Sequence, residues 1–227
     1  MNLDYKIKDN DLTIFCTDNL KEFAQDFKLY FDDNIEKIKD FFDINEKIEL
    51  LVALTDKKED VGFIYGESSF CGFFNDKGAF AYININGDKS NEYMKKGLMH
   101  EIVHHIYKFY VYGKDKPRIT WVDEGLAQFL SRQKDKLNDI DLYKNFLLEN
   151  VKDYEQININ NLNHEDKSFG MNNGYNLSYI AIRYLHDVLN KKDFIDTIKD
   201  KDKLYNLGNT IINNIKDYCE ITINKNK

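Results

Sequence analysis

The chain has 227 residues, of which 42% are hydrophobic and 14% aromatic, and it carries a formal net charge of −7. This composition indicates a folded globular protein rather than a disordered one, with enough length for a substantial core. A negative chain without clustered basic residues argues against nucleic-acid binding, and no segment reaches the roughly 20 apolar residues of a membrane span.

The N-terminus and the cysteines bear on the compartment. Residues 1–15, MNLDYKIKDNDLTIF, lack the basic start and continuous apolar run of a secretory signal. Cys16, Cys71 and Cys219 form an odd set without C-x-x-C spacing, which favours reduced thiols over disulfides. We therefore expect a cytoplasmic protein, or a mature chain that has lost a leader.

Strands dominate the first part of the chain, where apolar residues alternate or run together between turn residues. One long amphipathic helix interrupts them, because its apolar residues recur every three or four positions. In chain order, the predicted elements are a hairpin over 3–16 with its turn at Asp9–Asn10, a helix over 19–42, a buried strand over 47–55, and strands over 68–76 and 78–86 joined by a turn at 75–78.

Helices are predicted almost throughout after about Ser90. Their ranges are 90–112, 122–134, 139–152, 174–190 and 201–218. Strands first and helices second predict an α+β chain with two lobes, and a cleft between such lobes is a usual place for a site. There is no internal repeat and no Gly/Ser-rich linker, so we expect a single domain over 1–227 whose lobes span about 1–112 and 113–227.

The segment GLMHEIVHH, residues 97–105, contains the pattern H-E-x-x-H at His100, Glu101 and His104. Residues four apart on a helix share a face, so the two imidazoles point the same way, as zinc requires. Glu101 lies beside them, where a carboxylate can take a proton from a metal-activated water. The alternative is that two histidines spaced by four lie on an ordinary exposed helix.

A third ligand decides between these readings. The extended pattern H-E-x-x-H-x-x-G-x-x-H is excluded, because Tyr107 and Tyr110 stand where it needs Gly and His. A carboxylate on the next helix is the other option, and ITWVDEGLAQFL (119–130) supplies Asp123 and Glu124 in a helical first turn. The helix dipole also favours acidic residues in the first turn of a helix, and this explanation suits Asp123. Alternatively, Asp123 accepts a hydrogen bond from an imidazole of the site.

HEIVH followed by WVDEGLAQFL resembles the gluzincin metallopeptidases, the group that contains thermolysin and the aminopeptidase N family; the similarity spans roughly residues 94–132. The resemblance implies a zincin-like fold, with an N-terminal mixed β-sheet and helices, an active-site helix and a mainly helical C-terminal lobe. It also implies that His100, His104 and Glu124 bind Zn²⁺ and that Glu101 activates the water.

The same resemblance suggests an oxyanion-stabilising tyrosine. In the aminopeptidase branch a catalytic Tyr stands at the start of the following helix, nine residues before a Tyr-Leu pair. Tyr175 stands nine residues before Tyr184-Leu185, with Tyr179 as its competitor one turn later. The alternative is that both tyrosines are packing or surface residues.

The other histidines are not spaced from the H-E-x-x-H motif as further metal ligands would be. His105 points about 100° away from His104 on the same helix, so we expect a supporting or packing residue. We expect His164 in a loop and His186 on a helix face.

Two departures from the aminopeptidase pattern are visible. In gluzincins an edge strand before the metal helix pairs with the substrate backbone, a position that corresponds here to the strand over 78–86. The aminopeptidases carry Gly-Ala-Met-Glu-Asn there, whose Glu binds a free N-terminus, whereas this chain has Gly78-Ala79-Phe80-Ala81-Tyr82. The 227 residues also leave no room for the large N-terminal domain of those enzymes beside a catalytic domain, so we expect none in this sequence. Typical aminopeptidase activity is therefore not expected.

The leading hypothesis is a zinc metallopeptidase that acts on a peptide or protein substrate, with no nucleic-acid or membrane partner. One alternative is a catalytically latent or non-proteolytic binding or regulatory protein with the gluzincin fold. The C-terminal segment NLGNTIINNIKDYCEITINKNK, residues 206–227, is the candidate to block the site. A zinc hydrolase that cleaves a non-peptide amide is the third possibility.

Overall fold

The structure is a computed structural model, and its chain divides into two compact units, residues 1–113 and 114–227. The described residues are 3–61, 69–138, 145–146, 149, 158–165 and 167–224.

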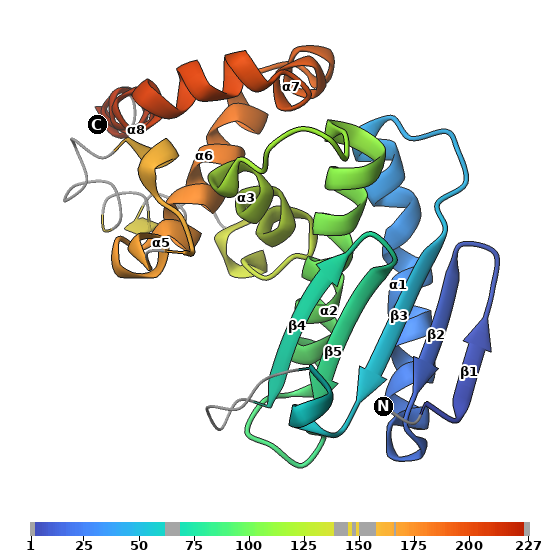
Figure 1. The fold of residues 1–227 in the computed structure, drawn as a ribbon. Coiled ribbons are helices and arrows are strands. Elements are labelled where there is room, and N and C mark those ends of the chain that lie inside the picture. The colour runs from blue at the N-terminus through green and yellow to red at the C-terminus, as the bar shows by residue number, and fades with distance from the viewer. Residues whose placement is uncertain are drawn as a thin grey trace. The chain divides into compact units, whose positions relative to one another are not determined.

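The first unit contains a five-stranded mixed sheet in the order β1-β2-β3-β5-β4 (Figure 1). β1 and β2 are antiparallel, β2, β3 and β5 run parallel to one another, and β4 pairs antiparallel with β5. The strands span Tyr5–Lys8 (β1), Leu12–Cys16 (β2), Leu50–Thr55 (β3), Phe70–Asn75 (β4) and Gly78–Ile83 (β5). The predicted hairpin and the three later strands are therefore confirmed.

Two helices, α1 (Lys21–Phe42) and α2 (Asn91–Ile106), lie on the same side of this sheet (Figure 1). The strand residues that face them are fully buried, as Ile14, Val52 and Ala81 illustrate. A short π-helix, η3 (Tyr107–Tyr112), continues α2. Short 3₁₀ turns lie at η1 (Asp18–Leu20) and η2 (Lys58–Val61).

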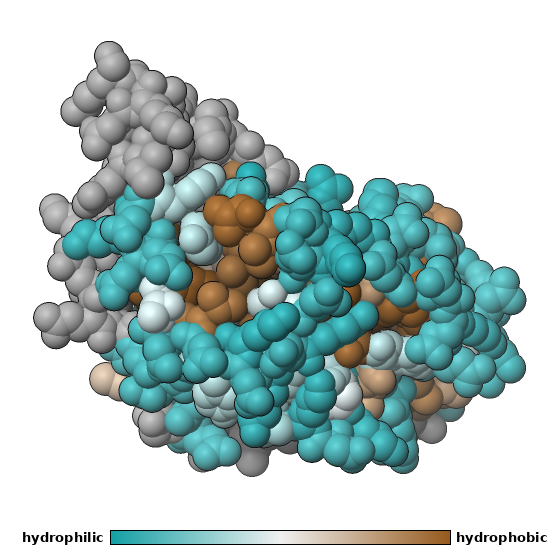
Figure 2. Space-filling model, turned by 90° about the horizontal axis from the view of Figure 1, so that it is seen from above, coloured by the Kyte–Doolittle hydropathy of each residue, from teal (hydrophilic) through white to brown (hydrophobic). Residues whose placement is uncertain are grey.

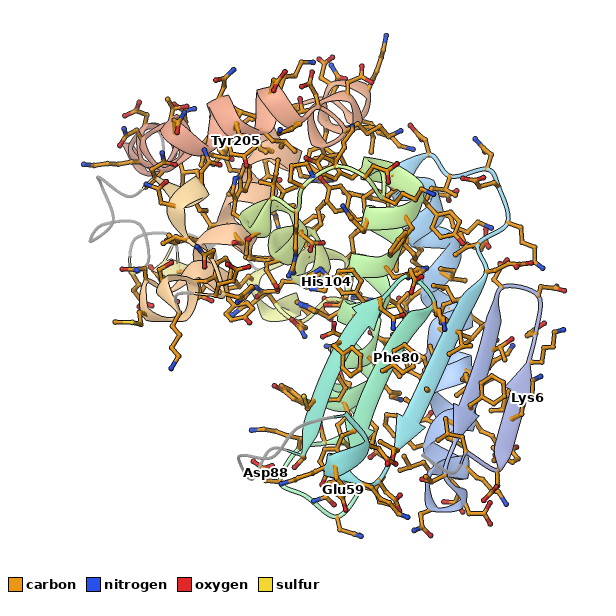
Figure 3. The ribbon with its side chains drawn as sticks, in the orientation of Figure 1. Lys6, Glu59, Phe80, Asp88, His104 and Tyr205 are labelled. Carbon is orange, nitrogen blue, oxygen red and sulfur yellow. The ribbon has the colours of Figure 1, made fainter. Side chains whose placement is uncertain are left out.

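The opposite face of the sheet carries aromatic side chains. Phe73 of β4 is 40% exposed, and its ring stacks on that of Phe80, with 5.3 Å between centroids. Figure 3 labels Phe80 in the middle of the sheet. Helices cover one face of this sheet, and the alternation of buried and exposed residues along β1 and β4 follows from that arrangement.

One strand position differs from the prediction. The strand over 78–86 was expected at the edge of the sheet, but β5 lies inside it, between β3 and β4. The edge strand is β4, because the hairpin through Asp76 and Lys77 returns the chain to pair with β3. Hydropathy patterns identify strands but do not give their order, so this prediction was wrong.

The second unit contains the helices α3 (Thr120–Leu130), α5 (Ser168–Met171), α6 (Gly174–Val188), α7 (Lys191–Ile198) and α8 (Lys201–Asn224), with the 3₁₀ turns η4 (Asp135–Asn138) and η5 (Ile159–Asn161). α3 packs closely on α6 because Gly125 has no side chain. An added Cβ there would lie 2.4 Å from the carbonyl oxygen of Ser178.

The expected α+β class is confirmed at this level, as a mixed five-stranded sheet with several helices. α7 was not predicted, and most of the helix predicted over 139–152 falls outside the described residues, as does the side chain of Cys219. None of the described helices is both long and apolar enough to cross a membrane. Figure 2 shows one face of the molecule, largely hydrophilic with hydrophobic side chains reaching the surface in places.

Candidate metal centre

The two histidines of the H-E-x-x-H pattern lie on one face of α2. Their Nε2 atoms are 2.9 Å apart and their rings are nearly perpendicular, with an interplanar angle of 85°. His104, labelled in Figure 3, is 2% exposed. Its ring stacks on that of Phe74 of β4, with 5.0 Å between centroids. The sheet therefore fixes the orientation of this imidazole.

The spacing of these nitrogens fits a shared zinc ion. Zinc–nitrogen bonds of about 2.0–2.1 Å in a tetrahedral site place two ligand nitrogens roughly 3.3 Å apart. The separation of the Nε2 atoms is close to this value. A neutral imidazole nitrogen is also the usual histidine donor to zinc, so the pair is chemically suitable.

Glu101 lies next to His100 on α2 and is half-buried. Its side chain extends over Gly72 of β4, where an added Cβ would lie 2.8 Å from the Cγ of Glu101 and 3.3 Å from its Cδ. A glycine at this point of β4 therefore makes room for the carboxylate arm. The sequence did not identify Gly72 as a residue of the site.

His105 belongs to the packing of the first unit. Its Nδ1 lies 2.8 Å from the carbonyl oxygen of Asn75, and its ring contacts Phe109. Burial lowers the pKa of this imidazole, although the Asn75 carbonyl and Asp76 act in the opposite direction. The expected packing role of His105 is confirmed.

In the second unit, Glu124 lies in α3 and is 4% exposed. Its Oε1 accepts a hydrogen bond from Nη2 of Arg118 at 2.8 Å and lies 2.9 Å from Nε2 of His164. A carboxylate buried to this degree needs such partners, because an isolated buried charge is very unfavourable. The contacts therefore hold the Glu124 carboxylate in a defined orientation.

Arg118 also binds Asp123 through its Nε. Burial opposes the charge on the guanidinium, but the Asp123 and Glu124 carboxylates raise the pKa of Arg118 overall. Asp123 lies in the first turn of α3, as the helix-dipole expectation requires, and Arg118 is its ion-pair partner. The role of Arg118 was not predicted.

His164 was expected to be an ordinary loop residue, and its contact with Glu124 was missed. Its ring lies 4.5 Å from that of Phe169 and 5.8 Å from that of Tyr175, measured between centroids. No spacing rule connects a histidine to a glutamate 40 residues earlier, so the sequence carried no signal for this contact.

The two candidate tyrosines of α6 have different surroundings. Tyr175 is 46% exposed and lies beside His164, whereas Tyr179 is 3% exposed and contacts Phe129 and Phe146. Burial is the main cause that raises the pKa of Tyr179. Tyr179 is thus a packing residue. The role of Tyr175 in the oxyanion remains a prediction.

His186 lies on the helix α6, as predicted. Its ring contacts those of Phe129 and Phe194, at 5.1 and 5.9 Å between centroids.

His100, His104 and Glu124 form a buried group that could hold a metal ion. Each offers one ligand atom, and these atoms lie within 4.8 Å of one another. They are the same three residues that the sequence predicted as metal ligands. No family model matches the chain, and no curated protein matches it either.

Proposed function

We propose that the protein is a zinc-dependent peptidase with a zincin-like arrangement, in which His100, His104 and Glu124 hold the zinc ion. The observation that carries the proposal is the closeness of these three ligand atoms, within 4.8 Å of one another. Two imidazoles and a carboxylate are a donor set of catalytic zinc sites, in which the fourth position is left to water or substrate.

A bound zinc ion supplies Lewis acidity, which lowers the pKa of water and polarises a peptide carbonyl. Glu101 accepts the proton of the attacking water and passes it to the leaving amine. Its place beside His100 on α2, over the glycine of β4, supports this role because its carboxylate arm is held against a strand. General base catalysis of this kind contributes about 10²–10⁴-fold to a rate.

The second unit contributes groups that orient and stabilise. Arg118 and His164 hold the Glu124 carboxylate through Oε1. The Tyr175 hydroxyl donates a hydrogen bond to the carbonyl oxygen as that oxygen gains negative charge, a type of interaction that is strong in a water-poor site. Its exposure and its place beside His164 favour Tyr175 over the buried Tyr179.

Metal analysis and peptide cleavage of matched variants test the proposal. Wild type is expected to carry about one zinc per chain and to cleave peptides in a mixed-sequence library. Glu101→Gln keeps the zinc and loses at least about a hundredfold in kcat, because the amide cannot accept the proton. His104→Ala and Glu124→Ala lose the zinc itself.

Glu92→Gln is the matched control, since Glu92 is an exposed acid of the same helix paired with Lys96. This variant is expected to keep both zinc and activity. Normal peptide cleavage by Glu101→Gln would contradict the assigned base. Purified wild-type protein that takes up no zinc would contradict the site as a whole.

A further inference from the structure

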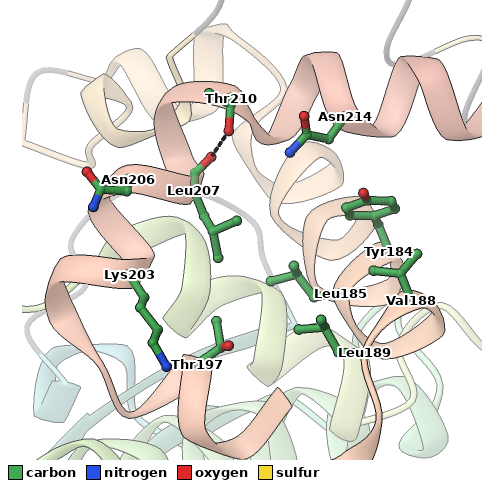
Figure 4. A pocket seen from close by; sticks show the side chains of 10 residues that line it. All are labelled: Tyr184, Leu185, Val188, Leu189, Thr197, Lys203, Asn206, Leu207, Thr210 and Asn214. Carbon is green, nitrogen blue, oxygen red and sulfur yellow. Dashed lines mark hydrogen bonds between the residues drawn. The ribbon is translucent and has the colours of Figure 1, made fainter. Parts of the chain in front are cut away.

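A pocket of about 480 Å³ lies in the second unit among α6, α7 and α8 (Figure 4). Its volume is within the range of about 300–1,000 Å³ typical of small-molecule sites. Leu185 of α6, Leu189 directly after α6 and Leu207 of α8 form an apolar part of its lining. An aliphatic chain in contact with these leucines would gain about 25 cal/mol for each Å² of apolar surface removed from water.

Two polar side chains that line this pocket have spare hydrogen-bonding capacity. Thr197 of α7 is 8% exposed, and its hydroxyl forms no hydrogen bond to any residue in the described part of the chain. The Lys203 ammonium has no ion-pair partner among the described residues. Figure 4 shows the Lys203 side chain extending toward Thr197. A ligand carboxylate between these two groups could accept a hydrogen bond from the Thr197 hydroxyl and pair with the Lys203 ammonium.

Neither Asp200 nor Asp202, the acids just before Lys203 in the chain, forms an ion pair with it in the described part of the structure. The Asp200 carboxylate instead caps the start of α8, where its Oδ1 accepts the backbone N–H groups of Asp202 and Lys203 at 3.0 and 3.1 Å. The ammonium at the pocket is therefore available to pair with an external anion. This charge disfavours a cationic ligand in the same place.

We propose that this pocket binds a small aliphatic carboxylate, with the hydrocarbon chain on the leucines and the carboxylate at Lys203 and Thr197. A neutral apolar ligand would leave the Thr197 hydroxyl without a partner, and a short polar anion would leave the leucines in water. The pocket contains none of the proposed zinc ligands, so the inference does not depend on peptidase activity.

Isothermal titration of the full chain with decanoate, decanol and decylamine tests the proposal. Decanoate is expected to bind with saturation, and decylamine to bind at least tenfold more weakly. Lys203→Met is expected to weaken decanoate binding about three- to fivefold, as for an exposed charge pair, and to leave the affinity for decanol unchanged. Thr197→Val preserves the side-chain shape and weakens decanoate about tenfold.

Lys192→Met is the matched control, because Lys192 is an exposed lysine of α7 that does not line the pocket. It removes the same charge and should leave decanoate binding unchanged. Leu207→Trp fills the pocket and should weaken decanoate and decanol together.

Absence of saturable decanoate binding would overturn the proposal. So would equal losses for decanoate and decanol in Lys203→Met, since the charge would then play no part. If Lys192→Met lost as much affinity for decanoate as Lys203→Met, the proposal would also be overturned, because net charge alone would explain the binding. Lys203 is exposed, so its variant tests the idea without a risk to folding.

Discussion

Gly72 is the residue at which β4 adapts to the Glu101 side chain. A methyl group added at Gly72 would lie 2.8 Å from the Cγ of Glu101, so the carboxylate arm must move in Gly72→Ala. We expect kcat for peptide hydrolysis to fall about ten- to a hundredfold, since displacing a catalytic group by about 1 Å has effects of this size. Zinc content, measured by metal analysis, should stay at the wild-type level.

Gly97→Ala is the control for this variant. The methyl group at Gly72 would also contact the Phe70 ring, at 2.9 Å. The three atoms nearest to a methyl group at Gly97 all belong to that ring, the closest at 2.8 Å. If the two variants lost kcat equally, displacement of Phe70 would explain both, and the assigned relation between Gly72 and Glu101 would be wrong.

Cys16 gives the first unit a stability that depends on pH. Burial raises the pKa of this thiol from 9.0 to about 11. In the unfolded chain the thiol ionises near its ordinary pKa, whereas in the folded chain it stays protonated, so stability is intact below pH 9 and falls as pH rises toward 11. The loss attributable to Cys16 is about 2 kcal/mol by pH 11.

The measurement is the free energy of unfolding from pH 7.5 to 11 under reducing conditions, compared with Cys16→Ala. Tyrosine and lysine ionisation affects both proteins, so the difference between their pH profiles isolates the thiol. The variant should be less stable at neutral pH because of the cavity, with a shallower decline above pH 9. Parallel profiles would refute the raised pKa.

Residues around Glu124 mark the limit of what the sequence predicts at this scale. Position on the next helix offered both Asp123 and Glu124, and the resemblance to the gluzincin motif selected Glu124. Arg118 and His164 were not identified, since their contacts with Glu124 depend on the path of loops rather than on a repeat of 3.6 residues. Contacts of that kind leave no periodic trace in a sequence.

Among the elements, the packing of α3 on α6 depends on Gly125. The Ser178 carbonyl lies 2.4 Å from the position of an added Cβ, and a backbone atom cannot move aside as a flexible side chain does. Gly125→Ala is therefore expected to lower the free energy of unfolding of the second unit by about 1–3 kcal/mol. Urea denaturation followed by Trp121 fluorescence measures the effect, because Trp121 is the single tryptophan of the chain.

Gly170→Ala is the matched control in the same unit, since an added Cβ at Gly170 meets nothing within 4 Å. It should leave the free energy of unfolding within a few tenths of a kcal/mol of the wild-type value, or raise it slightly through helix propensity. Equal effects of the two substitutions would show that loss of glycine, rather than the close approach of α3 and α6, determines the result.

Elements with one buried face were predictable, and their spatial order was not. The helix predicted over 19–42 is found as α1 (Lys21–Phe42), because its apolar residues recur at helical spacing and are buried. The edge position was assigned by the resemblance to the strand that precedes the metal helix, whereas β4 is the edge strand, and hydropathy patterns do not give strand order. α7 has only eight residues, too few for a clear period.

At the scale of the molecule, each compact unit carries part of the proposed zinc site. His100 and His104 belong to the first unit, and Glu124 belongs to the second. The sequence predicted the ligand triad and the α+β class. The zincin-like arrangement belongs to the proposal, because motif spacing constrains residues within and between neighbouring helices but not the packing of a whole chain.

Removal of the metal should therefore be felt in both units. Zinc at a hundred times its Kd adds about 2.7 kcal/mol to stability, which for a chain of this size corresponds to roughly 5–10 °C in Tm. Trp121 is 1% exposed and lies in the second unit, so its fluorescence reports the unfolding of that unit. We expect EDTA to lower the midpoint of this transition in wild type.

His104→Ala, a change in the first unit, should abolish the effect of EDTA, because a ligand lost from one unit releases the metal from the other. Glu92→Gln, on the same helix as His104, should respond as wild type does. A Trp121 midpoint that EDTA shifts equally in wild type and His104→Ala would mean that zinc binds the second unit without the histidines.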